Sequence, residues 1–152
     1  MSYTIDASVF VAAARPAEAG HAASLELLEQ VAHQGIPTTC PTLLLVECAA
    51  AIARATDDEA LAGQSLDLIE VFPGLSLVPL SRDLMHRAAE IAIRHRLRGA
   101  DAVYVAVAER VGDTLVSWDR EMLERGRAVI PTATPDDISE CVKFCETTKA
   151  RN

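Results

Sequence analysis

The segment Thr-Leu-Val-Ser-Trp-Asp at residues 114–119 joins a short apolar run to an acid. The run is rich in apolar and β-branched residues, which predicts a buried strand that ends just before the acid. Tyr-Thr-Ile-Asp at residues 3–6 repeats this arrangement near the start of the chain. Short buried strands of this kind are typical of a parallel sheet that is covered by helices on both faces.

Helical patterns fill the segments between the predicted strands. Apolar residues recur there at helical spacing, and capping residues, glycines and prolines mark the ends. We predict strands over residues 3–5, 36–40, 75–80, 114–117 and 129–130, and helices from 7 to a break at Pro16, then over 22–33, 43–55, 56–71, 82–96 and 100–111, with a last helix from 134. This alternation predicts an α/β fold, a three-layer α/β/α sandwich with a short, mostly parallel central sheet.

Length and composition set further limits. The chain has 152 residues, of which 50% are apolar and 24% charged, as in an ordinary globular protein of one domain. We expect residues 1–146 to form that domain and 147–152 to be a frayed tail. No apolar run is long enough for a membrane span, and the start lacks the basic region of a secretory signal, so we expect a soluble, cytoplasmic protein with no membrane partner.

The net charge of −8 is unevenly distributed. Residues 1–81 contain ten acids and two bases, whereas the charges of residues 82–152 balance. The overall charge argues against sequence-independent binding of nucleic acid. The acidic half suits a partner surface or a metal site, and the arginines of the other half suit phosphate contacts, but solvated helix faces explain the pattern equally well.

Four acids interrupt segments that otherwise look buried, namely Asp6, Glu47, Asp101 and Asp119. A buried carboxylate is unfavourable unless it is paired, protonated or bound to a metal. Asp6 and Asp119 follow predicted strands, at the sheet edge where ligand sites of parallel sheets collect. If the four acids converge, an all-oxygen site favours Mg²⁺ or Mn²⁺ over zinc and suits the hydrolysis of phosphodiesters.

Each acid also has a simpler interpretation. The two acids at strand ends could cap the helices that follow them. The two acids within helices could reach solvent or an arginine such as Arg54 or Arg98. It is less expected that all four do so independently, but their spacing alone does not prove that they converge.

Four blocks of the sequence resemble the characteristic blocks of PIN-domain nucleases in order and approximate spacing. They are Tyr-Thr-Ile-Asp-Ala-Ser at 3–8, Glu47 in its apolar helix, Gly-Ala-Asp-Ala-Val-Tyr at 99–104 and Leu-Val-Ser-Trp-Asp-Arg-Glu-Met at 115–122. The resemblance runs from residue 2 to about 130. In its length and its lack of a further domain, the chain is similar to the VapC-like toxins of bacterial type II toxin–antitoxin pairs.

The resemblance implies a metal-dependent endoribonuclease with Mg²⁺ or Mn²⁺ as cofactor and RNA as substrate. Asp6, Asp101 and Asp119 would bind the metal directly or through water, and Glu47 would be a ligand or a base that orients water. The resemblance also implies a homodimer and a cognate antitoxin that covers the site.

The resemblance extends to supporting residues. Ser8 and Ser117 correspond to small hydroxyl residues beside the first and last acids, which can hold a carboxylate or a metal-bound water by a hydrogen bond. Trp118 is interpreted either as a packing residue or as a surface on which an RNA base stacks. The arginines near the last two acids in sequence are the predicted phosphate contacts, namely Arg94, Arg96, Arg98 and Arg120.

Two other function classes compete with the nuclease. A receiver-like signalling domain also uses acids at strand ends and Mg²⁺, but it needs paired acids after the first strand and a lysine at a late strand end. Here Asp6 has no acidic neighbour, and the only lysines are Lys143 and Lys149. A catalytically silent PIN-fold binding module is the other alternative, and the presence of all four acids argues against it.

Overall fold

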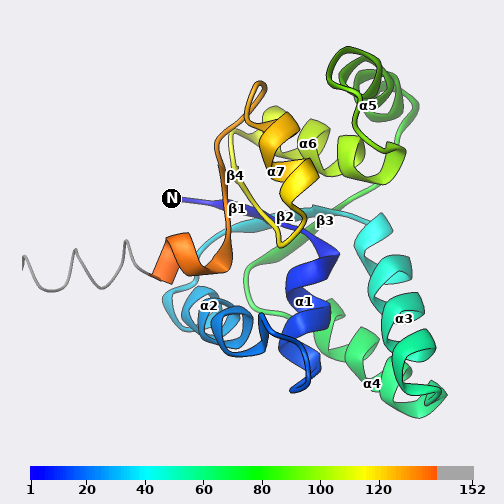
Figure 1. Ribbon diagram of the computed structural model, residues 1–152, viewed down its shortest axis with the longest axis vertical. Coiled ribbons are helices and arrows are strands. Elements are labelled where there is room, and N and C mark those ends of the chain that lie inside the picture. Colours follow the sequence, from blue (N-terminus) through cyan, green and yellow to red (C-terminus); the bar gives the residue numbers. More distant parts are fainter. Residues whose placement is uncertain (140–152) are drawn as a thin grey trace, which may run out of the picture.

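Five short strands form one sheet in the order β3-β2-β1-β4-β5 in the computed structural model, which describes residues 1–139 (Figure 1). They are β1 (Tyr3–Ile5), β2 (Thr38–Pro41), β3 (Leu75–Val78), β4 (Thr114–Val116) and β5 (Thr132–Ala133). All four pairings between neighbours are parallel. From the central strand β1 the chain leads first to β2 and β3 on one side and later to β4 and β5 on the other. The carboxyl end of β1 is therefore a topological switch point, where ligands of such sheets bind.

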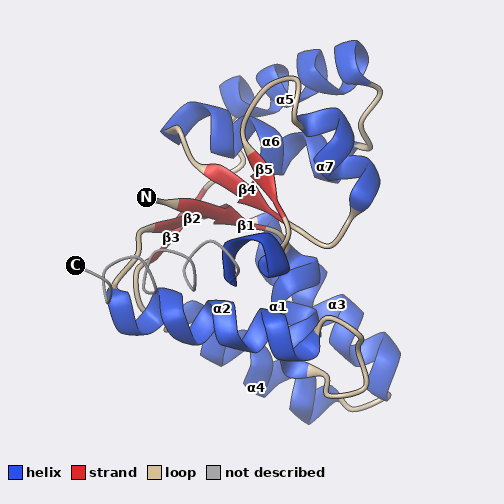
Figure 2. Ribbon diagram, turned by 60° about the vertical axis from the view of Figure 1, so that its left-hand side comes forward, coloured by secondary structure: helices blue, strands red, loops and turns tan. Residues whose placement is uncertain are grey.

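Helices cover both faces of the sheet (Figure 2). One layer contains α1 (Ala7–Ala14), α2 (His21–Gln34), α3 (Leu43–Thr56) and α4 (Glu59–Glu70), and the other contains α5 (Arg82–His95), α6 (Gly99–Val111) and α7 (Arg120–Gly126). A further helical segment begins at Pro135. This arrangement confirms the predicted three-layer α/β/α sandwich. No helix within residues 1–139 is long and apolar enough to cross a membrane.

Each face of the sheet has its own hydrophobic core. Val116 packs on one face with side chains of α1, α2 and α3, while its neighbour Leu115 packs on the other face with α6. Successive strand residues point to opposite faces, so a run of apolar residues serves both cores. Helix α6 is the most enclosed, because all of residues 102–108 are buried. The stretch 102–108 carries no charge on any side of the helix, and Asp101 lies just before this buried part.

The start of α4 differs from the prediction, which placed the cap at Thr56. Thr56 is still part of α3, and its hydroxyl donates to the Ile52 carbonyl at 2.8 Å. Asp57 then ends α3 with a left-handed backbone (φ 53°). The cap of α4 is Asp58, which accepts a hydrogen bond from the Leu61 amide at 2.9 Å. Several residues in this segment can cap a helix, so the pattern alone placed the boundary too early.

The strand predicted at Val129 and Ile130 is wrong. Both residues lie in a turn after α7, and both amides donate to the Gly126 carbonyl, at 2.8 and 3.1 Å. The strand β5 follows two residues later. Ile130 is buried against the core on the α6 side, so tertiary packing overrides its strand preference.

The end of the chain is only partly described. The predicted strands and helices do not include α7. A helix does begin at Pro135, as predicted. Its course beyond residue 139, the two lysines and the predicted tail at 147–152 lie outside the described residues.

Candidate active site

The four acids predicted from the sequence line one open depression of about 440 Å³. Asp6 follows β1 and Asp119 follows β4, and these neighbouring parallel strands end at the same edge of the sheet. Glu47 reaches the depression from α3, and Asp101 reaches it from the first turn of α6. Arg54 of α3 also lines it. The structure thus brings together four acids that are far apart in the sequence, while their catalytic role stays a prediction.

A network of short polar contacts holds the first of these acids. The Ser117 hydroxyl donates to Asp6 Oδ2 at 2.9 Å, and the Ser8 amide donates to the same oxygen at 3.2 Å. The Ser117 hydroxyl in turn accepts from the Asp119 amide at 2.9 Å. The Trp118 amide donates to the Ser8 hydroxyl at 3.1 Å. The two serines therefore connect the segments that follow β1 and β4 and fix the orientation of the Asp6 carboxylate.

An arginine lies among the acids. Arg98 Nε donates to Asp101 Oδ2 at 3.0 Å, and a terminal nitrogen of the same guanidinium contacts Asp119. Asp119 also caps α7 by accepting from the Met122 amide at 3.0 Å. Because 60% of the Arg98 side chain is exposed, solvent weakens both ion pairs. Arg98 thus gives the two acids an exposed counter-charge.

Glu47 of α3 is bound by a tyrosine of α6. The buried Tyr104 hydroxyl donates to Glu47 Oε2 at 2.7 Å. Burial raises the pKa of Glu47, and the charges of Asp6 and Asp101 raise it further, while the hydrogen bond from Tyr104 lowers it. Burial also raises the pKa of Asp101, against the opposing effect of Arg98. The depression therefore favours the binding of protons or cations.

The donor set has the chemistry of a site for a hard divalent cation. All four side chains offer carboxylate oxygens, the ligands that Mg²⁺ and Mn²⁺ prefer. Within residues 1–139, however, no three His, Cys, Asp or Glu side chains are arranged closely enough to hold one ion. Arg98 pairs with two of the acids, and Tyr104 binds a third. The residues fit a metal in their chemistry and line one depression, and two of them are paired with Arg98.

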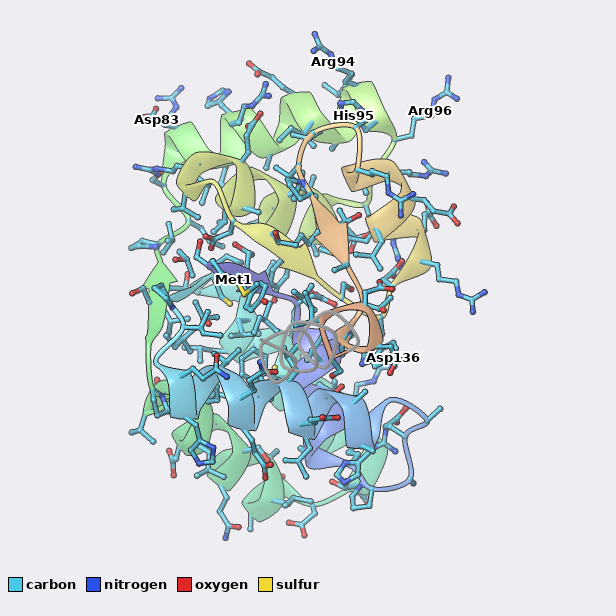
Figure 3. The ribbon with its side chains drawn as sticks, turned by 90° about the vertical axis from the view of Figure 1, so that its left-hand side faces the viewer. Met1, Asp83, Arg94, His95, Arg96 and Asp136 are labelled. Carbon is cyan, nitrogen blue, oxygen red and sulfur yellow. The ribbon has the colours of Figure 1, made fainter. Side chains whose placement is uncertain are left out.

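The other predicted phosphate contacts lie apart from this depression. Arg94 lines a separate hollow of about 280 Å³ on α5. Figure 3 shows Arg94 and Arg96 pointing away from the molecule at the end of α5. Arg120 is exposed at the start of α7. Of the four arginines, only Arg98 contacts the acids.

The simpler interpretations of the acids hold as well. Asp6 caps α1 through the Ser8 amide, and Asp119 caps α7. Asp101 pairs with Arg98, as one alternative suggested. Asp6 uses Oδ2 for its cap, and Asp119 uses Oδ1 for its cap and Oδ2 for the contact with Arg98. These local roles therefore coexist with the convergence of the acids on one depression.

Comparison with known proteins places this arrangement in a family. Residues 3–128 match the family model of the PIN domain. The chain belongs to the PIN domain family. No curated protein matches its sequence.

Solved structures share the fold of this PIN domain at low sequence identity. VapC20 of Mycobacterium tuberculosis, a toxin that cleaves the sarcin–ricin loop, has a TM-score of 0.69 and 19% identity, with 80% of this chain and 92% of that chain covered. VapBC2 of Rickettsia felis, bound to a DNA fragment from its promoter, has a TM-score of 0.67 and 13% identity, with 88% of this chain and 98% of that chain covered. FitAcB of Neisseria gonorrhoeae has a TM-score of 0.66 and 15% identity, with 88% of this chain and 97% of that chain covered.

Two features of the site escaped the sequence analysis of this PIN domain. Tyr104 lies three residues after Asp101 and so shares a helix face with it, a spacing that could have drawn attention to it. The contact between Arg98 and Asp119 joins residues of separate elements, and no local pattern predicts it.

Proposed function

We propose that this PIN domain is an endoribonuclease that hydrolyses RNA phosphodiester bonds with the help of Mg²⁺ or Mn²⁺. The observation that carries the proposal is the convergence of Asp6, Glu47, Asp101 and Asp119 on one open depression. Carboxylates gathered in this way repel one another unless a cation joins them. Family membership supports nuclease chemistry over the receiver-like alternative, and the complete set of acids supports an active enzyme over a silent binding module.

Each acid has a distinct part in the proposed reaction. Asp6, Asp101 and Asp119 would hold the ion, directly or through water. The ion would make water a stronger nucleophile and stabilise charge on the phosphate. Ser117 keeps the Asp6 carboxylate in one orientation. Glu47 has a raised pKa, which makes it a better proton acceptor near neutral pH, so it would take the proton of the attacking water.

The same proposal includes the biological setting. Similarity to VapC20, whose description is that of a toxin, supports a toxin that is inhibited by a cognate antitoxin. The acidic N-terminal half would receive a basic segment of that partner. We further propose that the protein is a homodimer that acts in the cytoplasm, and that Arg94, Arg96 and Arg120 contact RNA phosphates outside the depression.

A thermal-melt titration with Mn²⁺ and Mg²⁺ tests the metal site. The purified chain, freed of any partner, should gain a saturable increase in Tm. The Asp6→Asn variant should lose this increase and also lose RNA cleavage, because asparagine keeps the cap but not the charge. Asp67→Asn on the exposed surface of α4 makes the same change of charge away from the depression and should behave like wild type. RNA cleavage by Asp6→Asn at the wild-type rate would contradict the proposal.

A further inference from the structure

A second depression adjoins the one that the acids line. It has a volume of about 350 Å³, and its lining includes Trp118, Gly20 and Glu18. Ser8 and Val11 line both depressions. The two depressions are therefore neighbours on α1, one lined by the acids and the other by the indole ring, and we call the pair the groove.

The indole ring in this groove is held rigidly. Its Nε1–H donates to the Ser24 hydroxyl at 2.8 Å, so the polar atom of the ring is already satisfied. Gly20 packs against the ring so closely that a Cβ at this position would lie 2.6 Å from Trp118 Cε2. The Trp118 amide is bound to the Ser8 hydroxyl. A ring that is fixed in this way and still partly exposed offers a preformed apolar surface to a ligand.

The lining of the second depression selects against a phosphate. It contains no basic side chain, and its one charged residue is Glu18, which pairs with Arg15. The remainder is apolar or small, with Val11 and the aromatic ring as its largest surfaces. Such a site suits an uncharged, flat group that is connected to a phosphate in the adjoining depression.

We propose that the second depression is a base-binding subsite, in which an unpaired nucleobase of the RNA stacks against Trp118. This inference rests on the proposed ribonuclease function and adds a binding subsite to it. A base can reach the ring only where it is unpaired and not stacked in a duplex. With the base in the second depression, the phosphate attached to its ribose would lie in the adjoining depression that the acids line.

Fluorescence offers a direct test, because Trp118 is the only tryptophan in the sequence. The probes are single-stranded RNA octamers of mixed sequence and an abasic ribose-phosphate octamer of the same length and charge. They are titrated into the full-length Glu47→Gln variant with Mn²⁺ present, so that the RNA stays intact. The RNA should change the emission of Trp118 saturably, and the abasic octamer should not. Equal changes with both probes would overturn the subsite.

Substitution of the ring gives an independent readout. Trp118→Leu should raise the KM for single-stranded RNA by at least about fivefold, the lower end of what base stacking on an aromatic ring contributes. Trp118→Phe keeps an aromatic face and should restore most of the affinity. Both variants should keep the Mn²⁺-induced increase in Tm, which shows that the fold and the acids are intact. An unchanged KM in the leucine variant would contradict the proposal.

The two proposals can fail separately. If wild type cleaves RNA but the emission of Trp118 is unaffected by RNA, the base subsite is wrong and the ribonuclease stands. If the emission responds to RNA with bases but no RNA is cleaved, the subsite stands as a nucleic-acid contact and the ribonuclease is wrong. If neither is observed, both are wrong.

Discussion

The environment of Glu47 destabilises the metal-free fold and at the same time makes this side chain a better base. Its half-buried carboxylate lies among other acids, and the Tyr104 hydroxyl offsets this environment with a hydrogen bond. The raised pKa means that the folded state holds a proton on Glu47 more tightly than the unfolded chain does. The same property that weakens the metal-free fold makes Glu47 a better base.

Replacing Glu47 by glutamine should therefore stabilise the metal-free protein at neutral pH. The folded protein binds the extra proton, so the contribution of Glu47 to stability is greatest below its ordinary pKa of 4.5 and is lost as the pH rises through its raised value. At pH 7 the Tm of Glu47→Gln should exceed that of wild type. The increase should be about 2–4 °C for each kcal/mol of unfolding free energy that is gained when the charge is removed. Melting curves in EDTA from pH 4 to 8 measure this, and a difference that stays constant with pH would contradict it.

Arg98 has the opposite role, since it supplies the charge that the acids lack. Its pKa is raised by the charge of Asp101 and by the contact with Asp119. If a divalent cation must displace it, Arg98→Gln should reach half of its Mn²⁺-induced Tm increase at a severalfold lower Mn²⁺ concentration than wild type. Arg94→Gln, which changes a base on α5 away from the acids, should match wild type. Weaker binding of Mn²⁺ by the Arg98 variant would show that the guanidinium helps to hold the site together.

The segment that follows β4 combines a cap with a proposed metal ligand. Asp119 begins α7 through its contact with the Met122 amide, and asparagine can replace it in this role. Asp119→Asn should therefore keep the stability of the metal-free protein and lose RNA cleavage. Asp119→Ala should lose cleavage and also about 1 kcal/mol of unfolding free energy, because the cap is gone. Urea unfolding in EDTA separates the two effects, and equal stabilities of the two variants would mean that the cap contributes nothing.

Elements with a strong local pattern could be predicted from the sequence. The strands at residues 3–5 and 114–116 are short apolar runs that end on acids, and the rule that ligands bind at the carboxyl ends of parallel strands identified Asp6 and Asp119. An acid within an otherwise apolar helix was enough to single out Glu47. These features depend on residues that are close in sequence, so local physical chemistry is sufficient to find them.

Elements that depend on distant packing could not be predicted in this way. Val129 and Ile130 have the composition of a strand, yet they form a turn, because Ile130 is needed in the core beside α6. Tyr104 looks like any aromatic residue of a buried helix until Glu47, on another element, is placed opposite its hydroxyl. The contact of Arg98 with Asp119 joins two elements that are far apart in the sequence, so no local pattern predicts it.

At the scale of the whole molecule, the order of the strands brings the acids together. The central strand β1 has β2 on one side and β4 on the other, and the helical layers diverge from this point to opposite faces (Figure 2). The depression lies where the layers separate, with α3 of one layer and α6 of the other contributing acids. This explains why the site is open on one side although the strands beneath it are buried.

The pairing of β1 with β4 also governs when the site can exist. Tyr3 leaves the ribosome well before its partner Thr114, because the intervening strands and helices are made between them. Until Asp119 has also emerged, a growing chain holds an incomplete set of acids and an unfinished sheet. A nuclease with this strand order cannot act on RNA while its own synthesis has not yet passed residue 119.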